Sequence, residues 1–558
     1  MTDTHQDPAS FEILKNALYK IAEEMRVVLT KTAYSPILKS AGDFSCGVFD
    51  AAGDMVAQGP DLPIHLGSMP DAVRTIARTF AGDIHDGDVF VHNDPYDGGS
   101  HLPDVNVIRP AFHDGVLLGF ACLRAHWPDI GSATPGSYGA VIEIYGEGLR
   151  LPPVRLASKG VLNRDIEAII LANVRTPEER RGDLGSQLAA TLRACERLQA
   201  LARRYGVDVL TRTMAEVMDY SERLMRAMLS DLPDGEGAFQ DFLDGDGIED
   251  KPIWIRMQVQ KSGDRVLVTF DGTDPQVKGP INAPLSVTAS GVYCGLKTAI
   301  DPNSLIPPNS GCWRAIEVTA PEGSVLNCQF PAPVVYANHE ISHRLADMTM
   351  GALSDFLPDQ VMACSQGTSC ILTLGGVDPR TGQRYVSYET IKGGFGARPN
   401  KDGINAICAG ISNTMNTPIE VLEMAFPMRL LEYSIEPDSG GAGRYRGGNG
   451  SRRIWQLLEG AEATGSLCVE RMKSPPFGLQ GGKPGVTATV TLTTPDGAVS
   501  DLNGKGAFAA PAGSIVNMRT TGSGGMGDPA ERSDDAIRED LEDGYVTPEG
   551  LRRDYGRP

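Results

Sequence analysis

Six of the nine histidines lie between positions 65 and 126, in a stretch that is also rich in aspartate. Its densest polar segment, His92–Asp104, contains His101 and, three residues later, Asp104, while His126 follows further along the chain. Imidazole nitrogens combined with carboxylate oxygens suit Zn²⁺, Mn²⁺ or Fe²⁺ better than Mg²⁺ or Ca²⁺. The residue types therefore predict a transition-metal site. The alternative is that these side chains only make the hydrogen bonds of ordinary turns.

A predicted β-hairpin brings these three residues together. Val105–Phe112 and Val116–Arg124 have the composition of strands, and an Asp-Gly turn connects them. Pairing about this turn places Asp104 opposite Ala125 or His126, at the open end of the hairpin. Two imidazoles and one carboxylate then converge on one point, and a further carboxylate would complete the ligand set.

Two other motifs match the letters of known sites but lack their context. His339-Glu-Ile-Ser-His343 has the spacing of a zinc-protease helix, yet no later histidine can supply a third ligand, although Asp347 or Asp355 could. Gly522–Gly527 matches the dinucleotide-binding fingerprint, but the 31 residues that remain leave no room for a second parallel strand. Phosphate-binding-loop and Gly-x-Ser-x-Gly motifs are absent, so we expect no nucleotide or cofactor-binding site in this chain.

Composition excludes several classes of protein. The chain has 558 residues and a net charge of −20, and so acidic a surface disfavours nucleic acids and anionic membranes. The absence of an apolar run of about 18 residues argues against a membrane span. Ten scattered cysteines without a Cys-x-x-Cys pair, together with a polar N-terminus, are typical of a reduced, cytoplasmic protein.

Hydrophobic patterning predicts an α+β fold that is multi-region and β-rich, with hairpins and flanking helices. The acidic, glycine-rich segment 230–250 is interpreted as a boundary. It separates an N-terminal region, 1–235, that carries the metal site from a β-rich C-terminal region, 236–558, with glycine-rich loops interpreted as tight turns. The predicted helices cover residues 8–34, 176–205, 208–230, 340–353 and 419–425, with one short C-terminal helix within 530–551.

Several longer motifs carry a family resemblance. They are Ser40–Cys46, Asn93–Asp104, Ala125–Gly131, Gly440–Gly448 and Gly524–Pro529. With these motifs, nearly the whole chain resembles the hydantoinase B/oxoprolinase family. The family includes the B subunits of N-methylhydantoinase and caprolactamase, the C-terminal half of 5-oxoprolinase, and the corresponding subunits of acetone and acetophenone carboxylases.

The resemblance implies a divalent metal, Zn, Mn or Fe, held by Asp43, His101, Asp104 and His126. Asp43 enters only through the resemblance, because nothing in the hairpin pattern points to it. The same resemblance moves His339 and His343 out of the ligand set, into a structural or substrate-side role.

Three further residues receive expected roles beside this ligand set. Asp94 is the candidate catalytic residue that orients or deprotonates a water, with a structural turn aspartate as the alternative. His65 and Asp129 are expected to orient the ligands by hydrogen bonds.

The resemblance also implies a partner. A separate A subunit with an actin-like ATPase fold would use ATP to phosphorylate a lactam or hydantoin, and this B subunit would hydrolyse the activated ring through a metal-activated water, in an assembly of two A and two B subunits. The first alternative is the equivalent subunit of a ketone carboxylase, which the modest chain length disfavours. The second is a scaffold that only supports an active A subunit, which the intact ligand set disfavours.

Overall fold

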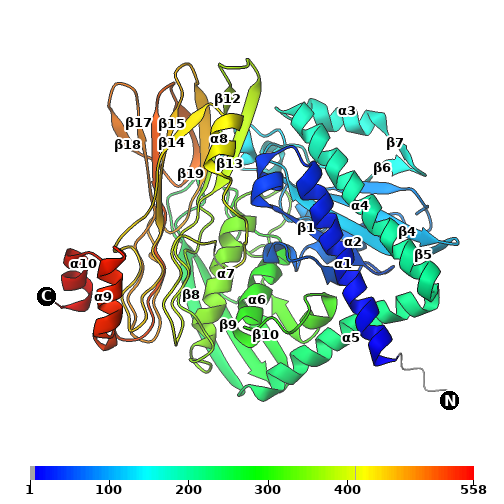
Figure 1. Ribbon diagram of the computed structural model, residues 1–558, viewed down its shortest axis with the longest axis horizontal. Coiled ribbons are helices and arrows are strands. Elements are labelled where there is room, and N and C mark those ends of the chain that lie inside the picture. Colours follow the sequence, from blue (N-terminus) through cyan, green and yellow to red (C-terminus); the bar gives the residue numbers. More distant parts are fainter. Residues whose placement is uncertain (1–6, 409, 558) are drawn as a thin grey trace.

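Four β-sheets with flanking helices make up the computed structural model, which describes residues 7–408 and 410–557 (Figure 1). The strand orders are β2-β1-β5-β4-β3-β6-β7, β11-β10-β9-β8, β13-β12-β16-β19 and β14-β15-β20-β17-β18. The predicted α+β class is therefore confirmed.

The N-terminal layer is a seven-stranded sheet covered by long helices. Its strands are β1 (Phe44–Phe49), β2 (Met55–Gln58), β3 (Val89–His92), β4 (Asp104–His113), β5 (Val116–His126), β6 (Val154–Ser158) and β7 (Val161–Leu162). Its helices are α1 (Pro8–Thr32), α2 (Met69–Thr79), α3 (Arg164–Ala172), α4 (Pro177–Tyr205) and α5 (Val207–Asp231). Helix α1 forms where predicted, because Asp7 caps its first turn and its apolar stripe is buried against the sheet and α4.

The β4–β5 hairpin has the register on which the metal prediction depends. Its turn pairs His113 with Val116, and a bulge beside Ala111 then shifts the pairing by one residue. Asp104 therefore lies directly opposite His126. Directly opposed residues project from the same face of the sheet, so both side chains point to one place.

A second sheet and two buried helices continue the chain. The strands are β8 (Gly235–Leu243), β9 (Ile253–Ser262), β10 (Arg265–Thr269) and β11 (Ile316–Thr319), and the helices are α6 (Leu285–Ile300) and α7 (Ala337–Leu353). The interpretation of 230–250 as a boundary segment was wrong in part, because β8 lies within it and its alternating side chains pair with β9. One hydrophobic core contains residues from both sides of position 235, and the predicted division at 235/236 stays a prediction.

The C-terminal region packs a four-stranded sheet against a five-stranded one around a second core. Its elements are β12 (Ile371–Val377), β13 (Arg384–Thr390), α8 (Ile419–Ala425), β14 (Met428–Ile435), β15 (Ser451–Leu457), β16 (Ala463–Cys468), β17 (Thr489–Thr493), β18 (Val499–Asp501), β19 (Lys505–Ala510) and β20 (Ile515–Arg519).

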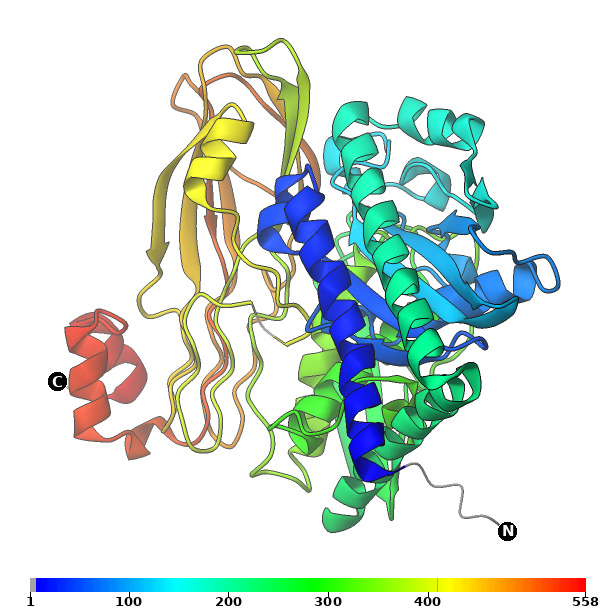
Figure 2. The same ribbon diagram turned by 45° about the vertical axis from the view of Figure 1, so that its right-hand side comes forward.

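The glycine-rich segments of this region are extended but irregular, rather than the tight turns that we expected. Below the two sheets they run side by side, and backbone hydrogen bonds join them (Figure 2). A Cβ atom added at Gly448 would collide with the carbonyl of Ile404, and one at Gly522 with the carbonyl of Ser439. Glycine is required at these positions because two backbones approach each other too closely for a side chain.

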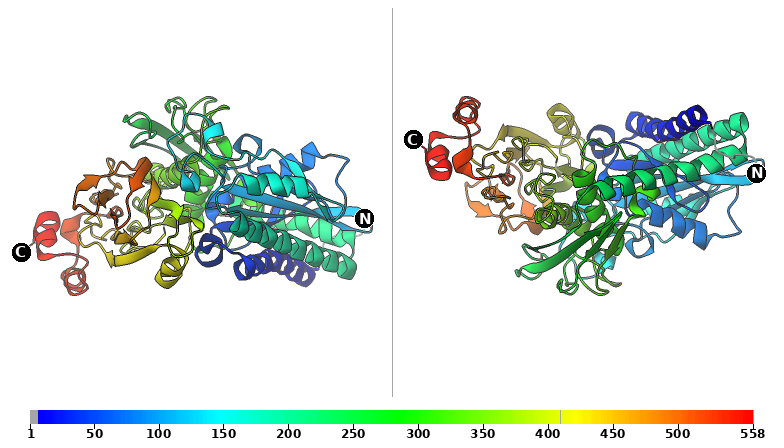
Figure 3. Two further views of the ribbon diagram at one scale, coloured as in Figure 1. Left: turned by 90° about the horizontal axis from the view of Figure 1, so that it is seen from above. Right: turned by 90° about the horizontal axis from the view of Figure 1, so that it is seen from below.

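The chain ends in two short helices, α9 (Asp534–Glu542) and α10 (Pro548–Tyr555), where the sequence pattern predicts one. Gly544, with φ +70°, interrupts them. They lie at one end of the molecule and the N-terminal layer at the other (Figure 3). In the described ranges, no helix is long and apolar enough to cross a membrane.

Candidate metal centre

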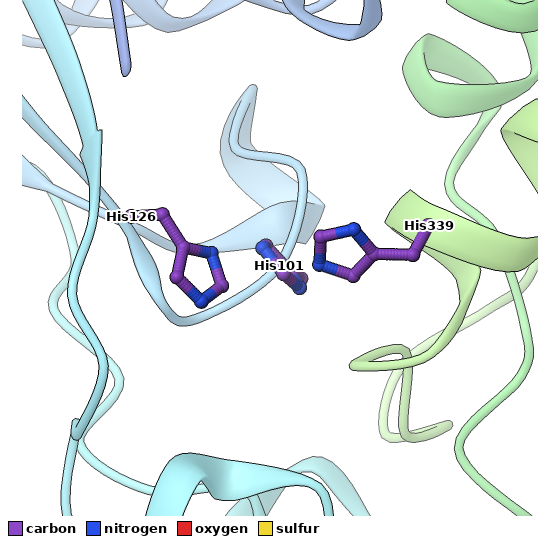
Figure 4. A group of neighbouring side chains, drawn as sticks. All are labelled: His101, His126 and His339. Atoms are coloured by element: carbon purple, nitrogen blue, oxygen red, sulfur yellow. The ribbon is translucent and has the colours of Figure 1, made fainter. Parts of the chain in front are cut away.

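Three histidines from three separate segments form a buried cluster (Figure 4). His101 precedes β4, His126 ends β5, and His339 lies in the first turn of α7. One ring nitrogen of each histidine lies within 4.8 Å of the others. The cluster therefore forms where the N-terminal sheet meets α7.

Asp104 adds a carboxylate to this cluster. Its Oδ1 lies 3.3 Å from His101 Nε2 and 3.4 Å from His126 Nδ1. Metal–ligand bonds of about 2.0–2.2 Å place neighbouring ligand atoms roughly 3–3.5 Å apart, so this spacing fits a shared cation. Among the described residues, none of these three atoms has a hydrogen-bond partner, although all are buried. Unsatisfied buried polar atoms are destabilising, and a bound metal ion would satisfy all three.

The other carboxylate oxygen of Asp104 is fixed by donors. Asp104 Oδ2 accepts hydrogen bonds from Ser100 Oγ at 2.5 Å and Asn338 Nδ2 at 3.1 Å, and it lies 3.2 Å from His65 Nε2. His65 Nδ1 in turn lies 2.8 Å from Ser45 Oγ. These contacts orient the carboxylate so that Oδ1 faces His101 and His126. His65 thus lies where the sequence analysis placed it, in contact with a predicted ligand.

Hydrogen bonds orient two of the histidines. His101 Nδ1 lies 3.0 Å from the carbonyl oxygen of Val335, which requires a proton on Nδ1 and leaves Nε2 free to bind a metal. His339 Nε2 lies 2.6 Å from the Tyr138 hydroxyl and 3.4 Å from the Tyr388 hydroxyl. Tyr388 also packs on His126, with ring centroids 4.5 Å apart.

Burial and mutual charge decide the protonation of the cluster. Burial raises the pKa of Asp104, but His101 and His65 outweigh it and hold the pKa well below the ordinary value. Burial, reinforced by His101 and His126, holds the pKa of His339 well below its usual range, so this ring is neutral at pH 7. An ionised Asp104 carboxylate and a neutral His339 ring are the forms in which these two groups bind cations.

Asp43 lies next to the cluster, one residue before β1. Its carbonyl accepts a hydrogen bond from the backbone N–H of His126 at 3.1 Å, and its side chain is buried. Burial raises the pKa of Asp43, while the charges of His126 and His65 oppose this effect. A cation in the cluster would favour the ionised form. Among the described residues the Asp43 carboxylate is not part of the three-histidine group, so the ligand role that the family resemblance implies stays a prediction.

Asp94 and Asp129 have other partners. Asp94 Oδ1 accepts from the backbone N–H of Tyr96 at 3.1 Å, and Oδ2 lies 3.4 Å from Arg150 Nη1, which are contacts of a turn cap. Asp129 accepts from the backbone N–H of Arg175 at 2.6 Å and from its guanidinium at 2.7 Å. No recorded contact among the described residues joins either carboxylate to the histidines.

We expect Asp94→Asn to retain its metal and most of its activity, because asparagine also caps a turn. The measurement is the metal content of the purified variant together with the kcat of the reaction that the protein catalyses. A kcat loss of about 10²–10⁴-fold at unchanged metal content would instead establish Asp94 as the general base.

The sequence analysis set His339 aside from the ligand set, but the structure brings its ring into the cluster. It also missed Tyr138, Tyr388, Ser100 and Asn338, which surround the histidines. The His339-Glu-x-x-His343 spacing was the available signal for His339. His343, one turn further along α7, lies outside the three-histidine group.

Comparisons with known proteins agree with the resemblance. The family model described as Hydantoinase B/oxoprolinase matches residues 7–529. The B subunit of a putative D-/L-hydantoinase from Pseudomonas sp. (strain NS671) is 33% identical over 573 residues, which cover 99% of this chain and 95% of that protein. The beta subunit of caprolactamase from Pseudomonas jessenii is 34% identical over 571 residues, which cover 99% of this chain and 96% of that protein.

Two solved structures are similar over the whole chain. The crystal structure of ATP-dependent caprolactamase from Pseudomonas jessenii aligns with a TM-score of 0.92 and 33% identity, covering 99% of this chain and 96% of that chain. The nucleotide-free structure of acetone carboxylase aligns with a TM-score of 0.92 at 21% identity, covering 99% and 80%. At that identity the second likeness shows only a common fold.

Proposed function

The chain belongs to the hydantoinase B/oxoprolinase family, and from this premise we propose that it is the metal-containing subunit of an ATP-dependent cyclic amidohydrolase. The proposal rests on three ligand atoms, one each from His101, Asp104 and His126. All three are buried without a hydrogen-bond partner among the described residues. Two relatives that align over nearly their full length are named for hydantoinase and caprolactamase, which supports a lactam or hydantoin as substrate.

We assign the metal to Asp43, His101, Asp104 and His126, with His339 on the substrate side of the same cluster. A divalent metal held there would supply a Lewis acid and lower the pKa of water toward neutrality. Ser100, Asn338 and His65 hold Asp104, and Val335 holds His101, so the ligands are oriented before anything binds. Tyr138 and Tyr388 enclose the histidines and exclude bulk water, which strengthens electrostatic interactions within the site.

A separate ATPase subunit supplies the activation that unstrained amides need. Phosphorylation of the amide oxygen makes the ring carbon more electrophilic, and the present chain completes ring opening. We expect an assembly of two copies of each subunit.

The test is to purify the chain with its ATPase partner and follow ring opening of hydantoin, 5-oxoproline and caprolactam by mass spectrometry. Ring-opened acid should appear only when ATP, metal and both subunits are present. A parallel reaction contains acetone or acetophenone with bicarbonate. Carboxylation of a ketone without hydrolysis of any lactam would overturn the proposal in favour of a carboxylase subunit.

A further inference from the structure

Glu147 is a buried carboxylate to which neither the sequence nor the comparisons assign a role. It faces the segment that leads into α7. Its Oε1 accepts hydrogen bonds from the backbone N–H groups of Val334 at 2.5 Å and Val335 at 2.7 Å. Among the described residues its Oε2 is buried without a partner. Burial raises the pKa of Glu147 to about 8, against the opposing effect of the two N–H groups.

One of the two residues that Glu147 holds reaches the cluster. The Val335 carbonyl orients His101 through Nδ1, at 3.0 Å. Three and four residues later, in the first turn of α7, Asn338 donates to Asp104 and His339 enters the histidine group. The approach to α7 thus contacts the cluster through Val335 and leads directly into two more of its residues.

Other hydrogen bonds hold the neighbouring residues of this segment. Pro331 and Pro333 have no N–H group, the Ala332 N–H donates to the nearby Gln329 carbonyl at 3.1 Å, and the Tyr336 N–H donates to the Pro280 carbonyl at 2.8 Å. The Pro331 and Pro333 carbonyls accept from Ile144 N–H and Asn282 Nδ2, each at 3.0 Å. Glu147 alone satisfies the N–H groups of both Val334 and Val335 in the described contacts.

We propose that Glu147 is a positioning residue of the metal centre: by binding Val334 and Val335 it fixes the carbonyl that orients His101. The inference rests on the proposed function, since it presupposes that the cluster binds a metal. Glu147 itself touches none of the proposed ligands in the recorded contacts. It acts through the backbone of Val334 and Val335, one step further out than a group that hydrogen-bonds to a metal ligand directly.

The test compares zinc affinity, by competition with a chromophoric chelator, in the wild-type chain, Glu147→Ala and Glu147→Gln. Loss of a direct hydrogen-bond partner of a ligand weakens metal binding by about 10–100-fold, and we expect the lower end of that range, about 10-fold, for Glu147→Ala. Glutamine keeps an acceptor oxygen at the same reach, so Glu147→Gln should bind zinc about as the wild type does. The ligand-field absorption of the Co²⁺-loaded alanine variant should also change, because the His101 ring is no longer held.

Asp88→Ala is the matched control. Asp88 is fully buried and accepts from two backbone N–H groups, His85 at 3.0 Å and Lys159 at 2.8 Å, but has no recorded contact with the cluster. It should lose thermal stability and keep wild-type zinc affinity. Equal zinc affinity in Glu147→Ala and wild type, or equal weakening in Asp88→Ala, would overturn the proposal.

Two further outcomes have separate meanings. If Glu147→Ala fails to fold, Glu147→Asp is measured instead, because it keeps the carboxyl and withdraws it by one methylene, and weaker zinc binding is again expected. A wild-type chain that binds no zinc, Mn²⁺ or Fe²⁺, even with its ATPase partner, would overturn the proposed metal centre and this inference with it. Normal binding by wild type and all Glu147 variants would overturn only the role of Glu147.

Discussion

Purified His101→Ala protein should contain no more than about one tenth of the metal of the wild-type chain, and its ring-opening activity should fall by at least about 100-fold. His101 Nε2 is a buried nitrogen that has no hydrogen-bond partner among the described residues, so it is free to bind a metal. It lies 3.3 Å from the Asp104 oxygen with which it would share the ion. Losing a group that only supports a ligand already weakens binding about 10–100-fold, so losing the ligand itself should have a larger effect. Plasma mass spectrometry of the two proteins measures the metal content.

His113→Ala is the control for this experiment. His113 belongs to the same hairpin but ends β4 at the turn, whereas the proposed ligands lie at the open end. It should keep the metal and the activity. A wild-type protein with about one metal ion per chain and a His101→Ala protein with the same content would contradict the ligand assignment.

The part of the site that could be predicted from sequence is the part that local pairing controls. Asp104 and His126 are separated by one hairpin, and an Asp-Gly turn limits their register to two choices. The bulge beside Ala111 decides between them; Pro110 and Gly119, residue types that often mark a bulge, lie next to it, but they do not fix its position. Asp43 lies one residue before the neighbouring strand β1, and strand neighbours across a sheet cannot be read from spacing, so only the family resemblance identified it.

Most of the residues that were missed come from distant segments; Ser100, beside His101, is the exception. His339 and Asn338 lie more than two hundred positions from His101, on a helix whose approach depends on the packing of the second sheet. Tyr138 and Tyr388 meet at His339 from a loop and from β13. No periodicity or motif encodes such a meeting, because it is produced by the packing of three sheets.

In the fold, too, elements set by local pattern could be predicted, whereas those set by packing between distant segments could not. Amphipathic helices such as α1 and hairpins such as β4–β5 follow from local pattern and formed where predicted. Strand β8 falls in the segment interpreted as a boundary because its sequence is acidic and glycine-rich, yet its alternation fits an edge strand beside β9. The close packing of the glycine-rich segments could not be predicted from sequence. Glycine has no side chain, so these segments carry no hydrophobic pattern that would indicate which segments pack together.

Arg344→Met should lower the free energy of unfolding by about 3–5 kcal/mol. Arg344 lies on α7 and is fully buried. Its guanidinium donates to Asp241 on β8 at 3.0 Å and to Glu470, just after β16, at 2.8 Å. The pKa of Arg344 is raised above its ordinary value: burial lowers it, but Asp241 and Glu470 outweigh that effect. Methionine fills a similar volume without charge, so the two acids lose this partner in a medium that solvates them poorly.

Arg314→Met tests whether the loss of stability expected for Arg344→Met is due to the burial of the ion pair. Arg314 also lies between two carboxylates, Asp219 at 2.8 Å and Glu222 at 3.0 Å, but its side chain is 38% exposed. Water and salt screen such a pair, and its loss should change the free energy of unfolding by about 0–1 kcal/mol. The measurement for both variants is the urea-unfolding midpoint followed by circular dichroism.

The ion pairs that remain after the substitution limit how far Arg344→Met can lower the free energy of unfolding. Arg471 still pairs with Asp241 at 2.8 Å, and Lys505 still pairs with Glu470, so neither acid is left without a cation. Glu470 retains the backbone N–H of Asp244 as well, at 3.0 Å. If these partners compensate fully, Arg344→Met will unfold at the same urea concentration as Arg314→Met, which would contradict the expected loss. If the variant does not accumulate, Asp241→Asn removes one charge of the same pair and should shift the midpoint in the same direction by less.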